Sequence, residues 1–72
     1  MEYYERLRQI RIDKDEKQDT IAKILNTTKQ QISKYETGQN EMTVGKLAKL
    51  CEYYNVSADY ILGLSKDAEW PR

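Results

Sequence analysis

Residues 18–38 read QDTIAKILNTTKQQISKYETG and contain two short helical patterns separated by a turn. The first pattern, about 18–25, carries its apolar residues on one face. The second pattern, about 29–36, begins only a few residues later. Asn26 lies between them, and asparagine is the usual substitute for glycine in the left-handed conformation that closes a helix. Because so short a turn forces a sharp angle between its helices, the stretch predicts a helix-turn-helix.

The segment 29–36 has few apolar side chains for a helix. At about 100° per residue, Ile32 and Tyr35 fall on one side and are predicted to anchor the helix in the core. An arc of about 140° on the other side holds polar side chains and no acid, namely Lys29, Gln30, Ser33, Lys34 and Thr37. Most polar arcs of this kind are solvated surface, so a contact surface needs support from the rest of the chain.

The chemistry of this arc suits duplex DNA. The Gln30 amide offers a donor and an acceptor that match the N7 and N6 edge of adenine in the major groove. A lysine donates to guanine O6 and N7, or to a phosphate. The first-turn amides after Thr28 form a positive helix end that favours a phosphate oxygen, and Gln18 holds a similar position at the start of the preceding helix.

The rest of the sequence completes an all-α domain. Apolar periodicity predicts three further helices, at about 2–13, 44–54 and 58–64. Hydroxyls that can cap a first turn precede three of the five helices: Thr28, Thr43 and Ser57. Asn55 repeats the left-handed ending of Asn26. We therefore expect one helical domain over residues 1–64, followed by a short C-terminal tail at 65–72.

Composition limits the class of protein. The 72 residues are 39% hydrophobic and 33% charged, which suits one small folded domain with a thin core. No apolar run is long enough to span a membrane, and the charged N-terminus does not resemble a signal peptide. With one cysteine as well, a cytoplasmic protein is expected. The net charge of zero counts against nucleic-acid binding, although a local basic face matters more than the total.

An enzyme is not expected. The chain has no histidine, so the commonest general base and metal ligand is missing, and neither a metal nor a cofactor is expected. Cys51 lies in the apolar pattern LAKLCEYY, which indicates a packed thiol rather than a nucleophile. With only three glycines, the chain has no Gly-rich phosphate loop.

Two runs of residues resemble the Cro/repressor-type helix-turn-helix family of bacterial and phage regulators, also described as lambda-repressor-like or XRE-type. The first run is Gln18-x3-Ala22-x2-Leu25-Asn26-Thr27-Thr28-x3-Ile32-Ser33-x-Tyr35-Glu36-x-Gly38. The second is Leu47-x2-Leu50-Cys51-x2-Tyr54-Asn55-Val56-Ser57-x-Asp59-Tyr60-Ile61-Leu62-Gly63. The resemblance covers about residues 6–63 and implies a compact five-helix domain that binds double-stranded DNA. The expected function is transcriptional regulation, with repression as its mode.

The resemblance also implies roles for individual residues, with the helix at 29–36 as the recognition helix in the major groove. The residues implied to face base edges are Lys29, Gln30, Ser33 and Lys34. Those implied to contact phosphates are Gln18, Thr27, Thr28, Thr37 and Gln39. Arg11 and Glu36 are implied to form a structural ion pair that ties the first helix to the third. In this chain Met42 stands where the family commonly has proline.

The C-terminal part of the domain suggests a protein contact. Tyr60, Ile61 and Leu64 cannot all fold inward on so small a domain, and the family often uses this end as a two-fold interface. A homodimer built on these three residues is therefore expected. The alternative function is a protein-interaction module on the same fold, such as an antitoxin or bridging adaptor with a protein partner, which the neutral net charge also favours.

Overall fold

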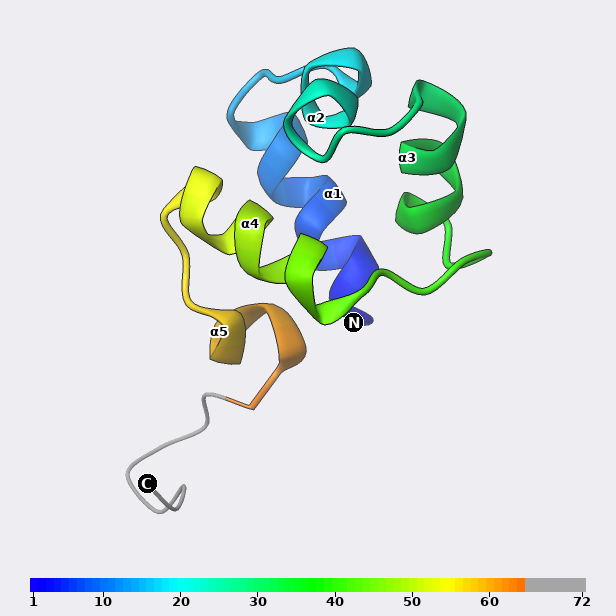
Figure 1. Ribbon diagram of the computed structural model, residues 1–72. Helices are drawn as coiled ribbons and strands as arrows, with labels where there is room; N and C mark the ends of the chain where they lie inside the picture. Colours follow the sequence, from blue (N-terminus) through cyan, green and yellow to red (C-terminus); the bar gives the residue numbers. More distant parts are fainter. Residues whose placement is uncertain (65–72) are drawn as a thin grey trace.

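The computed structural model describes residues 1–64 of the chain, and the tail expected at 65–72 lies outside the described residues. Five helices and no strand make up this part (Figure 1). They are α1 (Tyr3–Asp13), α2 (Gln18–Ile24), α3 (Lys29–Glu36), α4 (Val44–Tyr54) and α5 (Ala58–Leu62). The all-α, five-helix fold predicted from the sequence is confirmed.

Side-chain hydroxyls cap the first turns of three helices, at the residues that the sequence predicted. The hydroxyl oxygens of Thr28, Thr43 and Ser57 each accept a hydrogen bond from the backbone N–H three residues later, at 3.1, 3.2 and 3.3 Å. Each bond satisfies one of the amides that a first turn leaves without a partner inside the helix. The helix starts are therefore fixed locally, by residues that adjoin them in the chain.

The helix ends depend on residues with positive φ. Asn26 and Asn55, at φ 57° and 59°, take the left-handed conformation predicted for them. Gly63, at φ 74°, caps α5, so this helix ends at Leu62, two residues earlier than the sequence predicted. Asp15 also has a positive φ of 58°, in the loop between α1 and α2, and the sequence pattern did not reveal it.

The core gathers residues from all five helices: Leu7, Ile21, Ala22, Leu25, Ile32, Tyr35, Leu50, Cys51, Tyr54 and Ile61. Helix α2 packs on α3, α1 contacts both α3 and α5, and α4 contacts α5. The predicted packing role of Cys51 is confirmed, because its side chain is buried, and burial raises the pKa of its thiol. Burial also raises the pKa of the Tyr54 hydroxyl.

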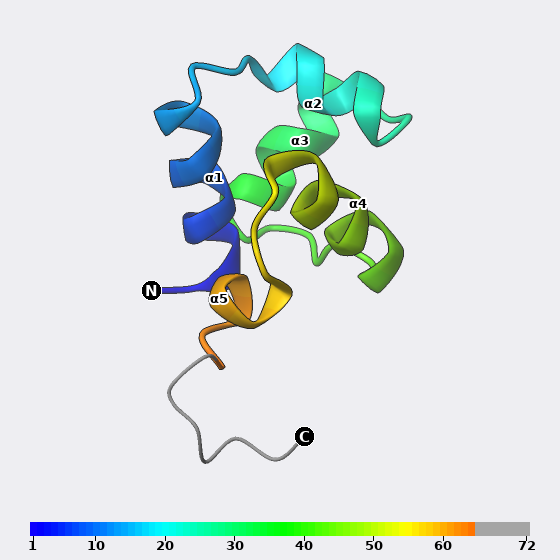
Figure 2. The same ribbon diagram turned by 90° about the vertical axis from the view of Figure 1, so that its left-hand side faces the viewer.

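The arrangement separates two ends of the molecule. Helices α2 and α5 lie at opposite ends in both views, with α1 running between them (Figures 1 and 2). In Figure 1, α3 lies along one side with the outer side of the helix free of other elements. A polar surface on α3 and an apolar surface on α5 therefore belong to different parts of the molecule.

Candidate nucleic-acid interface

The outer side of α3 carries a continuous polar surface. Each of its five side chains is exposed: Lys29, Gln30, Ser33, Lys34 and Thr37. We refer to these five residues as the polar face. The face contains two lysines and no acidic residue, in a chain with equal numbers of acids and bases. Its shape is a convex helical ridge of donors and acceptors, with a positive charge toward each end.

The inner side of α3 is fixed in the core. Ile32 is 1% exposed and Tyr35 is 5% exposed, which confirms the predicted anchors. A helix of eight residues is too short to be stable alone, so its orientation depends on these contacts. The two anchors determine which residues face outward, and therefore the composition of the polar face.

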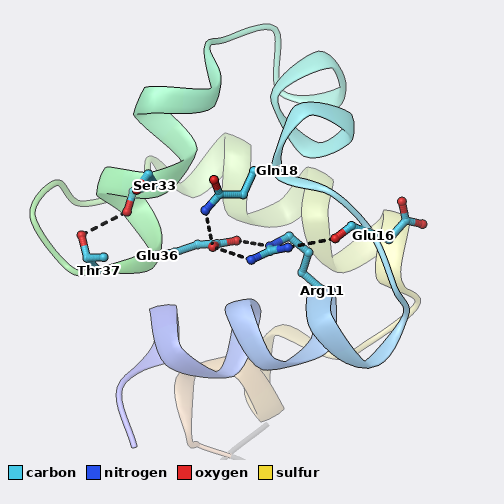
Figure 3. Close-up of polar contacts among 6 residues, drawn as sticks. All are labelled: Arg11, Glu16, Gln18, Ser33, Glu36 and Thr37. Carbon is cyan, nitrogen blue, oxygen red and sulfur yellow. Dashed lines mark hydrogen bonds and ion pairs between the residues drawn. The ribbon is translucent and has the colours of Figure 1, made fainter.

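One flank of α3 is held by the Arg11–Glu36 ion pair (Figure 3). Arg11 Nε donates to Glu36 Oε2 at 2.6 Å and Arg11 Nη2 donates to Glu36 Oε1 at 3.1 Å, a two-pronged contact. Arg11 Nη1 also donates to the backbone carbonyl oxygen of Glu16 at 2.8 Å. One guanidinium thus joins the end of α1, the α1–α2 loop and the end of α3.

The ion pair is mostly shielded from solvent, with side-chain exposures of 13% for Arg11 and 9% for Glu36. Breaking a buried pair by removing one partner costs about 3–5 kcal/mol, because the other charge is left without compensation. The pair therefore links α1 to α3 through a contact in which neither partner can be lost without leaving the other charge unpaired. It is the contact that the resemblance implied between these residues.

Gln18 has a different contact from the phosphate contact implied for it. Its Nε2 donates to Glu36 Oε1 at 2.9 Å, so the first residue of α2 joins the ion pair (Figure 3). One N–H of this amide is therefore used inside the protein, and the side chain is half-buried. No local sequence signal links positions 18 and 36, because only the packing of α2 on α3 brings them together.

The other residues implied to contact phosphates lie at the two ends of α3. Thr28 is exposed and caps the helix, while Thr27 is half-buried in the turn before it. At the opposite end, Thr37 Oγ1 donates to the Ser33 carbonyl oxygen at 3.0 Å (Figure 3). Gln39 Nε2 donates to Thr37 Oγ1 at 3.2 Å. Thr37 belongs to the polar face, and the other three lie within two residues of it in the chain. The side chains of Thr28, Thr37 and Gln39 already have an internal hydrogen-bond partner.

The second flank of α3 carries contacts that the sequence did not reveal. Asn40 Nδ2 donates to Gln31 Oε1 at 3.4 Å, which ties the α3–α4 loop to the helix. Lys46 Nζ, from the first turn of α4, donates to the Tyr35 hydroxyl at 3.3 Å. The hydrogen bond with the Gln31 side chain, more than the nearby Lys46, lowers the pKa of Tyr35 against the opposing effect of burial.

The apolar residues expected to form a dimer interface do not share one surface. Tyr60 and Leu64 are exposed, at 53% and 37%, but Ile61 is 0% exposed and belongs to the core. Ile61 was therefore wrongly included in the contact surface, because α5 has only one inward position for a large side chain and Ile61 takes it. Leu62, 43% exposed, is the apolar residue of α5 that the expectation missed.

Some features that other functions would need are not found in the described part of the chain. Residues 1–64 contain no group of three or more His, Cys, Asp or Glu placed to hold a metal ion. Within the same range, no helix has both the length and the apolar character that a membrane crossing requires.

Comparison with known proteins supports the family that the sequence resembles. The Helix-turn-helix family model matches residues 7–61. An uncharacterized HTH-type transcriptional regulator, YobD of Bacillus subtilis, is 34% identical over 67 residues, covering 93% of this chain and 60% of the relative. The chain thus spans less than two thirds of that relative's length.

Two solved structures have the same fold. A transcriptional regulator from Listeria innocua has a TM-score of 0.83 at 24% identity, covering 93% of this chain and 63% of that one. The P22 c2 repressor, solved in complex with a synthetic operator, has a TM-score of 0.79 at 25% identity and covers 90% of this chain and 98% of that one. From its motif residues, its fold and the extent of the family match, this chain belongs to the helix-turn-helix family of the Cro/repressor type.

Proposed function

We propose that this chain binds double-stranded DNA sequence-specifically as a bacterial or phage transcriptional regulator, with α3 in the major groove. The observation that carries the proposal is the polar face, an exposed, acid-free ridge on the second helix of a helix-turn-helix. The major groove is wide enough to admit an α-helix. Likeness to the P22 c2 repressor, whose structure holds a synthetic operator, supports both the DNA ligand and repression as the mode.

In this proposal, Lys29, Gln30, Ser33 and Lys34 face the base edges. The four side chains provide one amide that both donates and accepts hydrogen bonds, one hydroxyl and two cations. These groups are sufficient to distinguish base pairs by direct contact. Their spacing covers about one and a half turns of helix, so they can meet successive base pairs. The face has no acid to repel the phosphates on either side of the groove.

The contacts with the DNA phosphates are proposed at the two ends of α3, at Thr27 and Thr28 before the helix and at Thr37 and Gln39 after it. Thr28, Thr37 and Gln39 can keep their internal hydrogen bonds and still present a polar atom outward, because hydroxyls and amides have more than one hydrogen-bonding position. Gln18 retains one amide N–H beyond its bond to Glu36, and we assign that N–H to a phosphate.

The rigid mounting of α3 supports this assignment. The ion pair with Arg11 holds the end of α3 on one flank, and Ile32 and Tyr35 anchor its inner side. A helix that is already oriented loses little further conformational freedom on binding.

A homodimer is proposed as the binding unit, with Tyr60, Leu62 and Leu64 forming the contact between subunits. Their exposure at the end of the molecule that carries α5 supports an interface remote from α2. A two-fold dimer would present two copies of α3 to half-sites about one helical turn of DNA apart. A cytoplasmic location follows from a DNA ligand in bacteria.

A protein-interaction module remains the second candidate, since the same exposed apolar residues and the neutral net charge favour it. Catalysis is not proposed, because the polar face supplies recognition chemistry without a general base. Co-purification of a stoichiometric protein partner, together with a lack of salt-dependent DNA affinity, would favour the interaction module over the regulator.

The proposal is tested by selecting duplexes that bind the chain from a random pool and measuring affinity by fluorescence anisotropy. Gln30→Ala and Lys34→Ala should each cost about 1–3 kcal/mol on the selected duplex and relax its sequence preference. Lys23→Ala, an exposed lysine at the end of α2, serves as the control and should leave the preference unchanged. Selection that yields no preferred sequence, or variants that bind as the parent does, would contradict the proposal.

A further inference from the structure

Lys46 reaches from α4 to α3. It lies in the first turn of α4, where its backbone N–H is capped by Thr43 Oγ1 at 3.2 Å. Its ammonium lies 3.3 Å from the Tyr35 hydroxyl oxygen and 5.7 Å from the centre of the Tyr35 ring. The Lys46 side chain is half-buried. These contacts hold the ammonium beside α3, in contrast to the mobile position of a typical surface lysine.

The Lys46 ammonium has no carboxylate partner within residues 1–64. In that range the Arg11–Glu36 contact is the one ion pair within 4.0 Å. Tyr35 offers a neutral hydroxyl, which accepts a hydrogen bond but does not neutralise a charge. Glu41, the acid of the α3–α4 loop, is exposed and makes no ion pair with Lys46. Residues 1–64 therefore position this cation without providing a counter-ion.

The location of Lys46 relates it to the polar face. At about 100° per residue, Gln31 and Tyr35 follow Lys34 around α3, so they form the flank next to the Lys34 side of the face. The opposite flank is occupied by Glu36 and Arg11, whose charges cancel. The uncompensated cation thus stands on the Lys34 side, where one wall of the groove would lie if α3 entered it.

We propose that Lys46 contacts a DNA phosphate on the strand beside Lys34, and that the Tyr35 hydroxyl is the positioning residue that holds the ammonium for this contact. The inference rests on the proposed DNA-binding function and adds a contact from α4 to it. A positioned cation pairs with a phosphate at a smaller entropic cost than a free one. A phosphate contact of this kind strengthens binding to every sequence alike and depends on salt.

The first test measures the salt dependence of binding for Lys46→Gln and Lys49→Gln, on the selected duplex and on an unrelated duplex. Both substitutions remove one positive charge from α4, but Lys49 is exposed and has no hydrogen bond or cation–π contact like those of Lys46 with Tyr35. Lys46→Gln should weaken binding to both duplexes about threefold to tenfold and reduce the slope of log affinity against log salt by about one. Lys49→Gln should leave the slope unchanged.

The second test separates positioning from packing. Tyr35→Phe keeps the buried ring and removes the hydroxyl, so the fold should persist, as circular dichroism and thermal unfolding would report. We expect Tyr35→Phe to weaken binding about twofold to fivefold while the salt slope stays at the parent value, because the Lys46 charge remains. Adding Tyr35→Phe to Lys46→Gln should cause no further loss, since the hydroxyl acts through Lys46.

The outcomes are distinct. A parent chain that binds no duplex at low salt would overturn both this inference and the proposed function. If the parent binds, an unchanged salt slope in Lys46→Gln, or an equal fall in Lys49→Gln, would overturn the inference alone. Additive losses in the double variant would overturn the positioning role of Tyr35.

Discussion

At the scale of single residues, Gly38 is a position where both the backbone conformation and a neighbouring side chain favour glycine. It follows the end of α3 and has a φ of 82°, a left-handed conformation that residues with a side chain rarely adopt. A Cβ added there would meet Cζ of Tyr4 at 2.6 Å. The glycine therefore serves two needs at once, the turn after α3 and the close approach of an α1 side chain.

Gly38→Ala is expected to destabilise the fold by about 1–2 kcal/mol, because alanine must take the left-handed conformation and displace the Tyr4 ring. Urea unfolding measures the change. Gly45→Ala provides the matched control, because a Cβ at Gly45, in α4, would have nothing within 4 Å. It should stabilise the fold by about 0.5 kcal/mol, as alanine generally does in a helix. Shifts of the same sign in both variants would contradict this explanation.

At the scale of elements, the orientation of α3 depends on a charged residue at its end. Glu36 accepts hydrogen bonds from Arg11 of α1 and from Gln18 of α2, so one carboxylate connects three helices. Tyr53 of α4 also donates to the Glu16 carboxylate at 2.7 Å, which holds the α1–α2 loop from its other side. These hydrogen bonds hold α2 and α3 against α1, and they hold the α1–α2 loop against α4.

Glu36→Gln is expected to lower the free energy of unfolding by about 3 kcal/mol, because Arg11 would keep a mostly buried charge without its partner. Replacing both residues, as Arg11→Met with Glu36→Leu, should recover most of that loss, since no charge is then left unpaired. Urea unfolding of the single and double variants measures the coupling. A single variant as stable as the parent would show that the pair does not support α3.

At the scale of the whole molecule, the polar and the apolar surfaces lie in different places. The polar face lies on α3, whereas the exposed apolar residues Tyr60, Leu62 and Leu64 lie at the end that carries α5. Arg6 of α1 donates to the Ile61 carbonyl oxygen at 3.4 Å and so links α5 to α1. A dimer formed through α5 would thus keep both copies of α3 free for DNA.

Leu62→Lys is expected to yield a folded monomer, because Leu62 is exposed and a charge there opposes association without disturbing the core. Sedimentation velocity over a range of concentrations measures the association. Ile61→Ala is the contrasting variant and should destabilise each subunit by about 2–5 kcal/mol, because Ile61 is fully buried. A Leu62→Lys protein that associates as the parent does would place the interface elsewhere.

The sequence by itself determined the helices, their caps and the polar face. Each of these depends on residues within a few positions of one another, such as Thr28 before α3 or Asn26 after α2, and local spacing records such relations. The polar composition of residues 29–37 likewise needed only the helical period. The family resemblance added the Arg11–Glu36 pair, which no local pattern contains.

Only the tertiary structure decided the contacts between distant segments. The Gln18 side chain is hydrogen-bonded to Glu36, and the Lys46 ammonium is hydrogen-bonded to the Tyr35 hydroxyl. In α5, Ile61 is buried in the core whereas Leu62 is exposed. Apolar side chains on a helix as short as α5 compete for one inward position, and periodicity cannot decide among them over five residues. The direction of a long polar side chain depends on which partner the packing of the helices brings within reach, and that packing is a property of the whole fold.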